Sequence, residues 1–219
     1  MKQILSFIHP DAIIAKNVVI EPFTTIDADV VIGEGSWIGS NVSIMDGARI
    51  GKNCNIFPGA VISAIPQDLK YNDEKTYVEI GDNVTIRECA TINRGTSVSG
   101  QTIVGDDCLI MAYSHIAHDC VIGNNCIIVN SVALGGHVTI EDSVVIGGNS
   151  AVQQFTRIGK MAMVGGMTGV LYDVIPYGLS TGNRNRLQGL NLVGLRRKKV
   201  SNEVLDETFD LFVSLDANE

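Results

Sequence analysis

Aliphatic residues recur at every sixth position along most of this chain. The series begins at Ile8 and continues without a miss to Ile62. After polar residues at the next two positions it resumes at Ile80 and continues in the same phase to Val170. A strict six-residue repeat with an aliphatic residue, often followed by glycine, is the signature of a parallel β-helix. The pattern therefore predicts a long rod built from short strands and turns.

Three six-residue units should close one coil of about 18 residues, so that residues 18 apart lie above one another at one strand spacing. The roughly 28 positions between residues 8 and 170 then predict about nine coils and a rod about 45 Å long. Such a narrow rod has little core per residue and exposes flat sides. We therefore expect it to oligomerise.

Two segments interrupt the ladder. Residues 64–79 are rich in turn formers and charged side chains, so we expect them to leave the rod as a loop and re-enter in phase. Residues 95–101 keep the phase, with Val98 at a ladder position, but they also resemble a loop. Either segment could border a functional site.

The chain changes character after Pro176, because a proline prevents further strand pairing. Beyond it, apolar residues from Leu187 onward are compatible with a helix that begins near Asn183. Ser201 could cap a second helix. The apolar stripe of that second helix would be Val204, Leu205, Thr208 and Phe212. We therefore predict a β-helix over residues 1–176 and a C-terminal α-helical segment over residues 177–219.

Composition narrows the possible partners. The net charge of −8 argues against nucleic acid as a general partner, since phosphate binding needs a basic surface. No apolar stretch approaches the ~20 residues of a membrane span, and the N-terminus does not resemble a signal peptide. We expect a cytoplasmic protein without stable membrane insertion. Four of the five cysteines share a phase with small residues, so we interpret them as core residues and not as disulfides or metal ligands.

The 18-residue spacing also places several polar and ionisable residues close together on one patch of the rod. The patch contains three of the four histidines, a carboxylate, a glycine and an amide: His115, His118, Asp119, Gly136, His137 and Gln154. A histidine is the natural general base near neutral pH, and a glycine N–H beside it can stabilise an oxyanion. The patch contains no obvious nucleophile motif. Direct base-catalysed acyl transfer is therefore more economical than a covalent acyl-enzyme.

Two other classes of function remain open at this point. The three histidines could be the ligands of a zinc enzyme of the β-helix carbonic anhydrase type, with an open fourth position. The rod could also be a binding module or scaffold without catalytic activity.

Several motifs together resemble the bacterial UDP-N-acetylglucosamine 3-O-acyltransferase family, which performs the first step of lipid A biosynthesis. Beside the six-residue ladder they are residues 66–70, 91–96, 115–120, 135–138 and 194–197. The resemblance implies an all-β fold, a left-handed parallel β-helix of hexapeptide repeats with a short C-terminal α-helical segment. It also implies a homotrimer with active sites between subunits.

The resemblance implies a role for each residue of the patch. His118 would be the general base for the sugar 3-hydroxyl, Asp119 its orienting partner, and the N–H of Gly136 the oxyanion donor. Contacts to substrate or acyl donor are implied for Asp68, Lys70, His115, His137, Gln154, Asn191 and Arg197. Gly148 and Gly166 stack in one column, where Gly166 would be the floor of a groove that measures the acyl chain. We expect that chain to run along the rod from His118, and we expect a long donor because glycine leaves the groove open.

The implied substrates are UDP-N-acetylglucosamine and a 3-hydroxyacyl chain on acyl carrier protein, with no cofactor and no metal. The acidic carrier would meet the basic run at residues 196–199. A related nucleotide amino sugar is an alternative acceptor. The chain departs from the family pattern at Gln153, where histidine is common, and at Val193, where an acidic contact can occur. Its C-terminal region is shorter by several tens of residues, so we expect a truncated or a divergent member.

Overall fold

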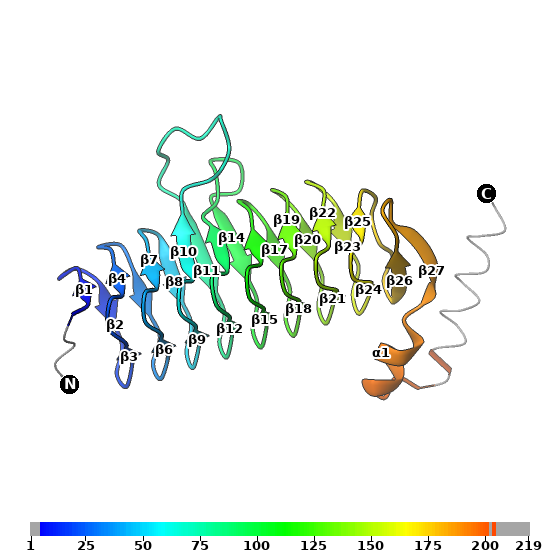
Figure 1. The fold of residues 1–219 in the computed structure, drawn as a ribbon, viewed down its shortest axis with the longest axis horizontal. Coiled ribbons are helices and arrows are strands. Elements are labelled where there is room, and N and C mark those ends of the chain that lie inside the picture. The colour runs from blue at the N-terminus through cyan, green and yellow to red at the C-terminus, as the bar shows by residue number, and fades with distance from the viewer. Residues whose placement is uncertain (1–4, 202, 205–219) are drawn as a thin grey trace.

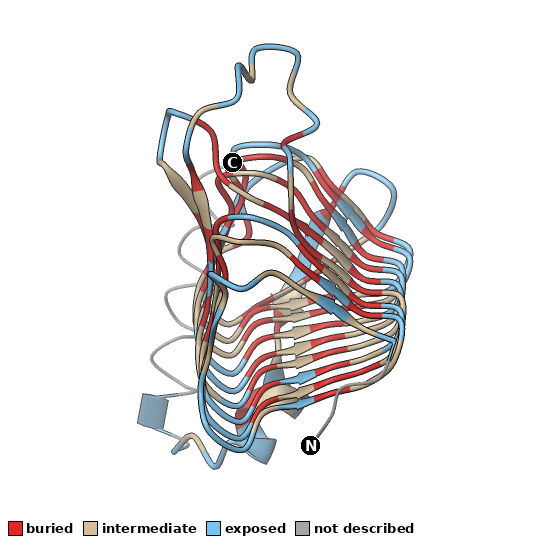
Figure 2. Cartoon of the chain, turned by 90° about the vertical axis from the view of Figure 1, so that its left-hand side faces the viewer, coloured by how far each residue is buried: buried red, intermediate tan, exposed pale blue. Residues whose placement is uncertain are grey.

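The computed structural model describes residues 5–201, 203 and 204, which form a rod of stacked coils with three sides (Figures 1 and 2). Each side is one sheet. Sheet 1 contains β1 (Phe7–Ile8), β4 (Thr25–Ile26), β7 (Ser43–Ile44), β10 (Val61–Ala64), β13 (Thr91–Asn93), β16 (His115–Ile116), β19 (Ala133–Leu134), β22 (Ala151–Val152) and β25 (Gly169–Val170). Sheet 2 contains β2 (Ile13–Ile14), β5 (Val31–Ile32), β8 (Ala48–Ile50), β11 (Tyr77–Ile80), β14 (Gln101–Val104), β17 (Val121–Ile122), β20 (Thr139–Ile140) and β23 (Arg157–Ile158). Sheet 3 contains β3 (Val19–Ile20), β6 (Trp37–Ile38), β9 (Asn55–Ile56), β12 (Thr85–Ile86), β15 (Leu109–Ile110), β18 (Ile127–Ile128), β21 (Val145–Ile146), β24 (Met163–Val164), β26 (Gly178–Thr181) and β27 (Arg186–Leu190).

The ladder residue of almost every strand points into the rod and its neighbour points out, as alternation along a strand requires. Ile26, Ile56 and Ile116 are fully buried examples, and the buried segments of successive coils stack over one another in Figure 2. Four cysteines are also buried there as free thiols, which confirms their interpretation as small core residues: Cys54, Cys108, Cys120 and Cys126.

The chain turns most corners through a residue with positive φ, three positions after the ladder residue. Asn125 at 57° and Asn149 at 57° are typical, and asparagine tolerates this left-handed conformation better than most side chains. Asp119 at 59° and His137 at 62° occupy the same corner position. Two residues of the predicted patch therefore lie on corners of ordinary coils.

Both predicted loops are present, but they are insertions and not parts of the ladder. In an ordinary coil three hexads separate paired residues, as between His115 and Ala133. Val61 instead pairs with Thr91, which is two hexads further than an ordinary partner, and Thr91 pairs with His115, which is one hexad further. The interpretation of Val98 as a ladder residue was wrong, because its side chain is 76% exposed in the second loop. Each insertion is a whole number of hexads long, so the six-residue phase of the ladder is the same before and after it. The phase therefore does not show that residues have been inserted into a coil.

The two loops leave the rod at one edge and rise together from its upper side in Figure 1. One follows β10 and the other follows β13, which are neighbours in sheet 1. We call this corner edge 1–2, since the chain there passes from sheet 1 to sheet 2.

The segment after Pro176 differs from the sequence prediction. The prediction of a helix beginning near Asn183 was wrong. The structure instead has the strand β27 there, which forms an antiparallel hairpin with β26. The strand β26 pairs in parallel with β24, so the hairpin covers backbone groups that the last coil would leave unpaired. A helix follows only at α1 (Leu192–Arg197). Most of the second predicted helix, including Leu205, lies outside the described residues.

Among the residues that the structure describes, no helix is both long and apolar enough to cross a membrane.

Ladder and loop positions should respond differently to the same substitution. Val104→Ala removes two methyl groups from a position that is 1% exposed and should lower the free energy of unfolding by about 2 kcal/mol. Val98→Ala, at the same sequence phase but in the loop, should change it by less than about 0.5 kcal/mol. Urea denaturation followed by circular dichroism measures both. Equal losses would place Val98 in the core and contradict the insertion.

Candidate active site

The predicted patch lies on edge 1–2, directly beyond the two loops along the rod. His118 and Asp119 follow β16, Gly136 and His137 follow β19, and Phe155 follows β22. The main chains stack as the 18-residue spacing predicted. The N–H of His137 donates to the carbonyl of His118 at 3.0 Å, and the N–H of Phe155 donates to the carbonyl of Gly136 at 3.1 Å.

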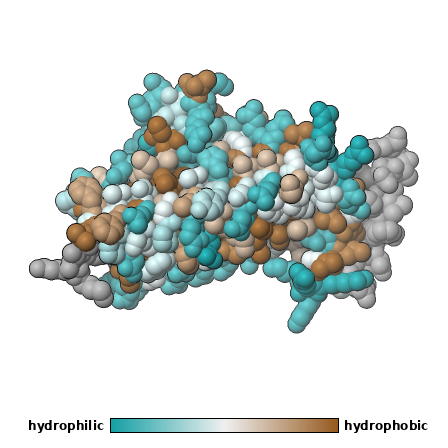
Figure 3. All heavy atoms as spheres, in the orientation of Figure 1, coloured by the Kyte–Doolittle hydropathy of each residue, from teal (hydrophilic) through white to brown (hydrophobic). Residues whose placement is uncertain are grey.

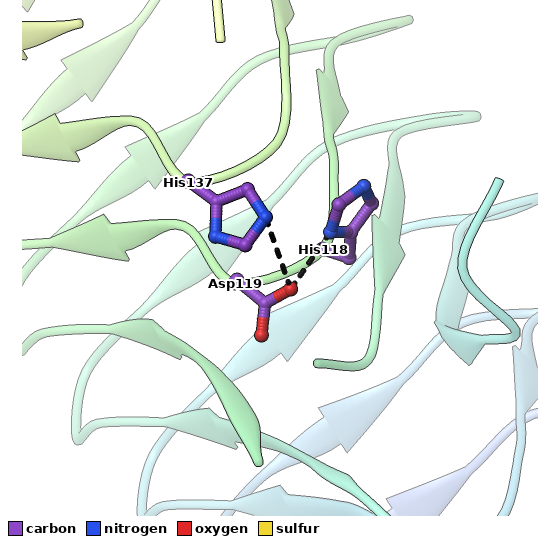
Figure 4. A group of neighbouring side chains, drawn as sticks. All are labelled: His118, Asp119 and His137. Carbon is purple, nitrogen blue, oxygen red and sulfur yellow. Dashed lines mark hydrogen bonds and ion pairs between the residues drawn. The ribbon is translucent and has the colours of Figure 1, made fainter. Parts of the chain in front are cut away.

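His118 and Asp119 form a hydrogen-bonded dyad (Figure 4). Nδ1 of His118 lies 2.7 Å from Oδ2 of Asp119, and the carboxyl side chain is fully buried while the imidazole is 12% exposed. Because an ionised carboxylate only accepts hydrogen bonds, it fixes the hydrogen on Nδ1 and leaves a lone pair on Nε2. The dyad therefore presents a proton acceptor at the surface of the rod.

His137 completes the group from the next coil. Its Nε2 lies 3.7 Å from Oδ2 of Asp119, and its ring meets that of His118 edge-on at 5.1 Å between centroids. On its other face it stacks on Phe155 at 4.6 Å with nearly parallel planes. The ring of His137 is thus held between an aromatic side chain and the dyad.

The second loop supplies the remaining partners of Asp119. Its carboxylate accepts hydrogen bonds from the Thr96 N–H at 2.9 Å, from the Thr96 hydroxyl at 2.7 Å, and from the Ser99 hydroxyl. Burial would raise the pKa of Asp119, but the hydrogen bonds from Ser99, His118 and Thr96 outweigh it and lower that pKa to about 2. Sequence reasoning missed Thr96 and Ser99 as partners. The one feature of the sequence that pointed to these residues was the break in the ladder at the loop. The 18-residue spacing predicts neighbours only within ordinary coils, so it could not place inserted residues beside Asp119.

Gly136 lies directly beside the imidazole. An ideal Cβ there would lie 2.5 Å from Cε1 of His118, so any larger residue would force the imidazole to move. Among the described residues, nothing accepts a hydrogen bond from the Gly136 N–H. An unpaired main-chain N–H beside a general base can stabilise a negatively charged oxygen.

The first loop closes a pocket of about 230 Å³ against this group. The residues that line it include Asp68, Lys70, Tyr71, Val98, His137 and Phe155. The structure therefore brings the predicted Asp68 and Lys70 to His137 although these residues lie far apart in the sequence. Gln154 is exposed, next to Phe155 on the same turn.

His115 lies apart from this group. Its Nδ1 is 2.8 Å from the hydroxyl of Thr91, and burial, with a smaller contribution from His118, lowers its pKa. Among the described residues, the compact set of possible metal ligands is His118, Asp119 and His137, with ligand atoms within 4.8 Å of one another. The trio of histidines that the zinc interpretation requires is not the set that the structure brings together.

Asn191 and Arg197 line a second pocket, of about 350 Å³, over sheet 3 and not at edge 1–2. Its walls are mainly apolar, with Val145, Met163 and Val193 among them, and hydrophobic side chains gather near α1 in Figure 3. The amide of Asn191 accepts from the Gly194 N–H at 3.1 Å and donates to the Met161 carbonyl at 3.0 Å. The acceptor therefore caps α1, and the donor ties the side chain to the rod.

Gly148 and Gly166 also lie away from the dyad. They are neighbours, since an ideal Cβ on Gly166 would lie 3.3 Å from the Gly148 carbonyl oxygen. They follow strands of sheet 3, at the corner where the chain enters sheet 1, which we call edge 3–1. From His118 to Gly166 the chain completes two coils and two thirds of another, so the two residues lie on different edges. The course of an acyl chain along the rod from His118 towards Gly166 therefore stays a prediction, and it does not follow one edge of a single chain.

Comparison with known proteins agrees with this geometry. Residues 29–64 and 101–136 match the family model described as bacterial transferase hexapeptide (six repeats), and residues 173–215 match UDP N-acetylglucosamine O-acyltransferase, domain 2. An acyl-[acyl-carrier-protein]–UDP-N-acetylglucosamine O-acyltransferase of Chlamydia abortus is 50% identical over 199 residues, covering 91% of this chain and 71% of the relative. A Rhizobium johnstonii relative of the same name is 46% identical, and the match covers 66% of this chain and 54% of the relative.

Solved structures give the same result. The UDP-N-acetylglucosamine acyltransferase of Bacteroides fragilis superposes with a TM-score of 0.95 at 45% identity, over 97% of this chain and 83% of that one. The Francisella novicida enzyme gives 0.94 at 41% identity, over 96% and 78%. These relatives confirm the predicted fold class, an all-β, left-handed parallel β-helix with a short C-terminal helix. The chain therefore belongs to the UDP-N-acetylglucosamine O-acyltransferase family.

Proposed function

We propose that this chain transfers a 3-hydroxyacyl group from acyl carrier protein to the 3-hydroxyl of UDP-N-acetylglucosamine, the first step of lipid A biosynthesis, with His118 as the general base. Its family membership supports the reaction. The observation that carries the assignment of residues is the 2.7 Å contact between Nδ1 of His118 and the buried carboxylate of Asp119.

In the proposed mechanism, Nε2 of His118 takes the proton of the sugar hydroxyl as its oxygen attacks the thioester carbonyl. Asp119 keeps the hydrogen on Nδ1 and stabilises the imidazolium that forms. The Gly136 N–H donates to the oxygen that becomes negative in the tetrahedral intermediate. When the intermediate collapses, the carbon–sulfur bond breaks and the thiol leaves with the proton that His118 received. The base is thus restored in each cycle.

A complete site in this proposal needs a second copy of the chain. The dyad lies on edge 1–2, the two glycines lie on edge 3–1, and Asn191 and Arg197 lie over sheet 3. In a homotrimer, edge 1–2 of one copy can face another edge of the next, so that groove and dyad meet between subunits. The trimer and the cytoplasmic location stay predictions.

The basic run Arg196 to Lys199 supports acyl carrier protein as the donor. All four side chains are exposed at and just after the end of α1, and Arg197 also lines the pocket over sheet 3. On a chain with a net charge of −8, this local cluster offers an acidic carrier a complementary surface.

Replacing the base should abolish turnover without disturbing the rod. His118→Ala should lower kcat by at least about 10²–10⁴-fold, because the hydroxyl loses its proton acceptor. His9→Ala, which changes the one histidine outside the patch, is the matched control and should keep wild-type activity. The assay is mass spectrometry of the acylated nucleotide sugar, with circular dichroism as the test of folding. Wild-type kcat in folded His118→Ala protein would refute the mechanism.

The charge of Asp119 should contribute stability that acid removes. Its folded-state pKa of about 2 lies below the ordinary value of 3.8, so the contribution is present above pH 4 and is lost as the pH falls towards 2. The stability difference between the wild type and Asp119→Asn should therefore shrink by up to about 2 kcal/mol between pH 5 and pH 2. Urea denaturation at a series of pH values measures it. A difference that does not change with pH would contradict an ionised Asp119.

Enlarging Gly166 should shorten the preferred acyl chain. Methionine there would fill the groove at edge 3–1, and each methylene that no longer fits loses about 0.8 kcal/mol of burial. Gly166→Met should shift the ranking of kcat/KM towards shorter donors, with Gly166→Ala between it and the wild type. A panel of acyl carrier proteins with chains of increasing length tests this. An unchanged ranking in both variants would exclude Gly166 as the floor of the groove.

A further inference from the structure

We propose that the loop of residues 95–101 belongs to the catalytic machinery, with Ser99 and Thr96 as positioning residues that hold Asp119 for His118. The inference rests on the proposed function, in which His118 is the base and Asp119 its partner. It assigns a role to a loop whose described residues make no hydrogen bond to the imidazole of His118.

Every acceptor site of the Asp119 carboxylate is occupied. A carboxylate offers about four lone-pair directions. Here Oδ1 accepts from the Thr96 N–H and the Ser99 hydroxyl, and Oδ2 accepts from the Thr96 hydroxyl and His118 Nδ1. Three of the four donors come from the loop and only one from the base.

The hydroxyl hydrogens have defined directions in this network. The Thr96 hydroxyl accepts from the Val98 N–H at 3.2 Å, so its own hydrogen is free to point at Asp119. The Ser99 hydroxyl lies between the Gln101 carbonyl, at 2.8 Å, and the carboxylate, which is nearer. Because the hydrogen bond to a charged acceptor is the stronger one, the Ser99 hydrogen goes to Asp119.

These donors decide which nitrogen of His118 can act as a base. A fully buried carboxylate without them would favour its protonated form, since burial penalises the charge. A protonated Asp119 could then donate to Nδ1 of His118, and the hydrogen of the neutral imidazole would move to Nε2. That tautomer cannot take a proton from the sugar hydroxyl at Nε2. The loop therefore acts on the reaction through Asp119, by keeping it an acceptor.

The loop is anchored to the rod independently of the dyad. The Gly95 N–H donates to the Tyr77 carbonyl at 3.1 Å, and the Gly100 carbonyl accepts from the Tyr77 N–H at 3.0 Å. Residues 96–98 also form part of the wall of the 230 Å³ pocket. The segment that holds Asp119 is thus fixed at its ends and borders the place where a substrate would bind.

Ser99 provides the clean test, since its side chain supplies one donor and its residue does not line the pocket. Ser99→Ala should lower kcat about 10-fold, the effect of losing one hydrogen bond to a charged group, and leave both KM values within about two-fold. Ser99→Thr keeps a hydroxyl and should recover most of the activity. Ser36→Ala is the matched control. It removes a buried hydroxyl that donates to the Gly51 carbonyl in a distant coil, and it should change stability but not kcat.

A double-mutant cycle then separates positioning from a general structural effect. In an Asp119→Asn background, Ser99→Ala should have no further effect on kcat, because the carboxylate that it serves is gone. An equal loss of kcat in both backgrounds would overturn the inference. So would wild-type kcat in Ser99→Ala when His118→Ala and Asp119→Asn both have a lowered but measurable kcat, a result that leaves the proposed function intact. Full activity of His118→Ala would instead contradict the proposed function itself.

Discussion

Every coil of this protein must return its strands to register with the coil before it. Parallel pairing satisfies the main-chain hydrogen bonds along each of the three sheets, and the ladder residue of each strand fills the interior. A residue can vary only where it faces outward or where the chain turns a corner. This constraint concentrates the chemistry of the molecule at its corners, where a side chain can change without disturbing the core.

Edge 1–2 shows how residues can be inserted while successive coils stay in register. The loop after β10 adds two hexads and the loop after β13 adds one, yet the chain re-enters the next sheet in register after each. Both loops therefore lie beside the next corner, where Asp119 and His118 sit on an ordinary turn. The rod supplies a rigid platform, and the insertions supply pocket walls and hydrogen-bond donors. A scaffold of this kind holds reacting groups more precisely than loops alone could.

The charge at the centre of the site depends on the same arrangement. Asp119 is buried at a corner, where a carboxylate would ordinarily be costly. Donors from the neighbouring insertion make the ionised form the stable one, and the ion then fixes the tautomer of His118. The departures at Gln153 and Val193 lie outside this network. Gln153 is exposed on the turn after β22, and Val193 lines the pocket over sheet 3.

The six-residue ladder, the coil and the stacking of His118, Asp119, Gly136 and His137 could be predicted from the sequence alone, because a fixed repeat converts sequence distance directly into position. The sequence also indicated both loops. The three-dimensional structure was needed to show how much chain each loop inserts, because additions of whole hexads leave the phase unchanged. For the same reason it alone placed Thr96 and Ser99 on Asp119, and Asp68 and Lys70 beside His137. The separation of Gly166 from the edge of the dyad already follows from the sequence, since the chain between them is not a whole number of 18-residue coils. The hairpin of β26 and β27 replaced the expected helix because the open end of a sheet offers partners that local propensity does not register.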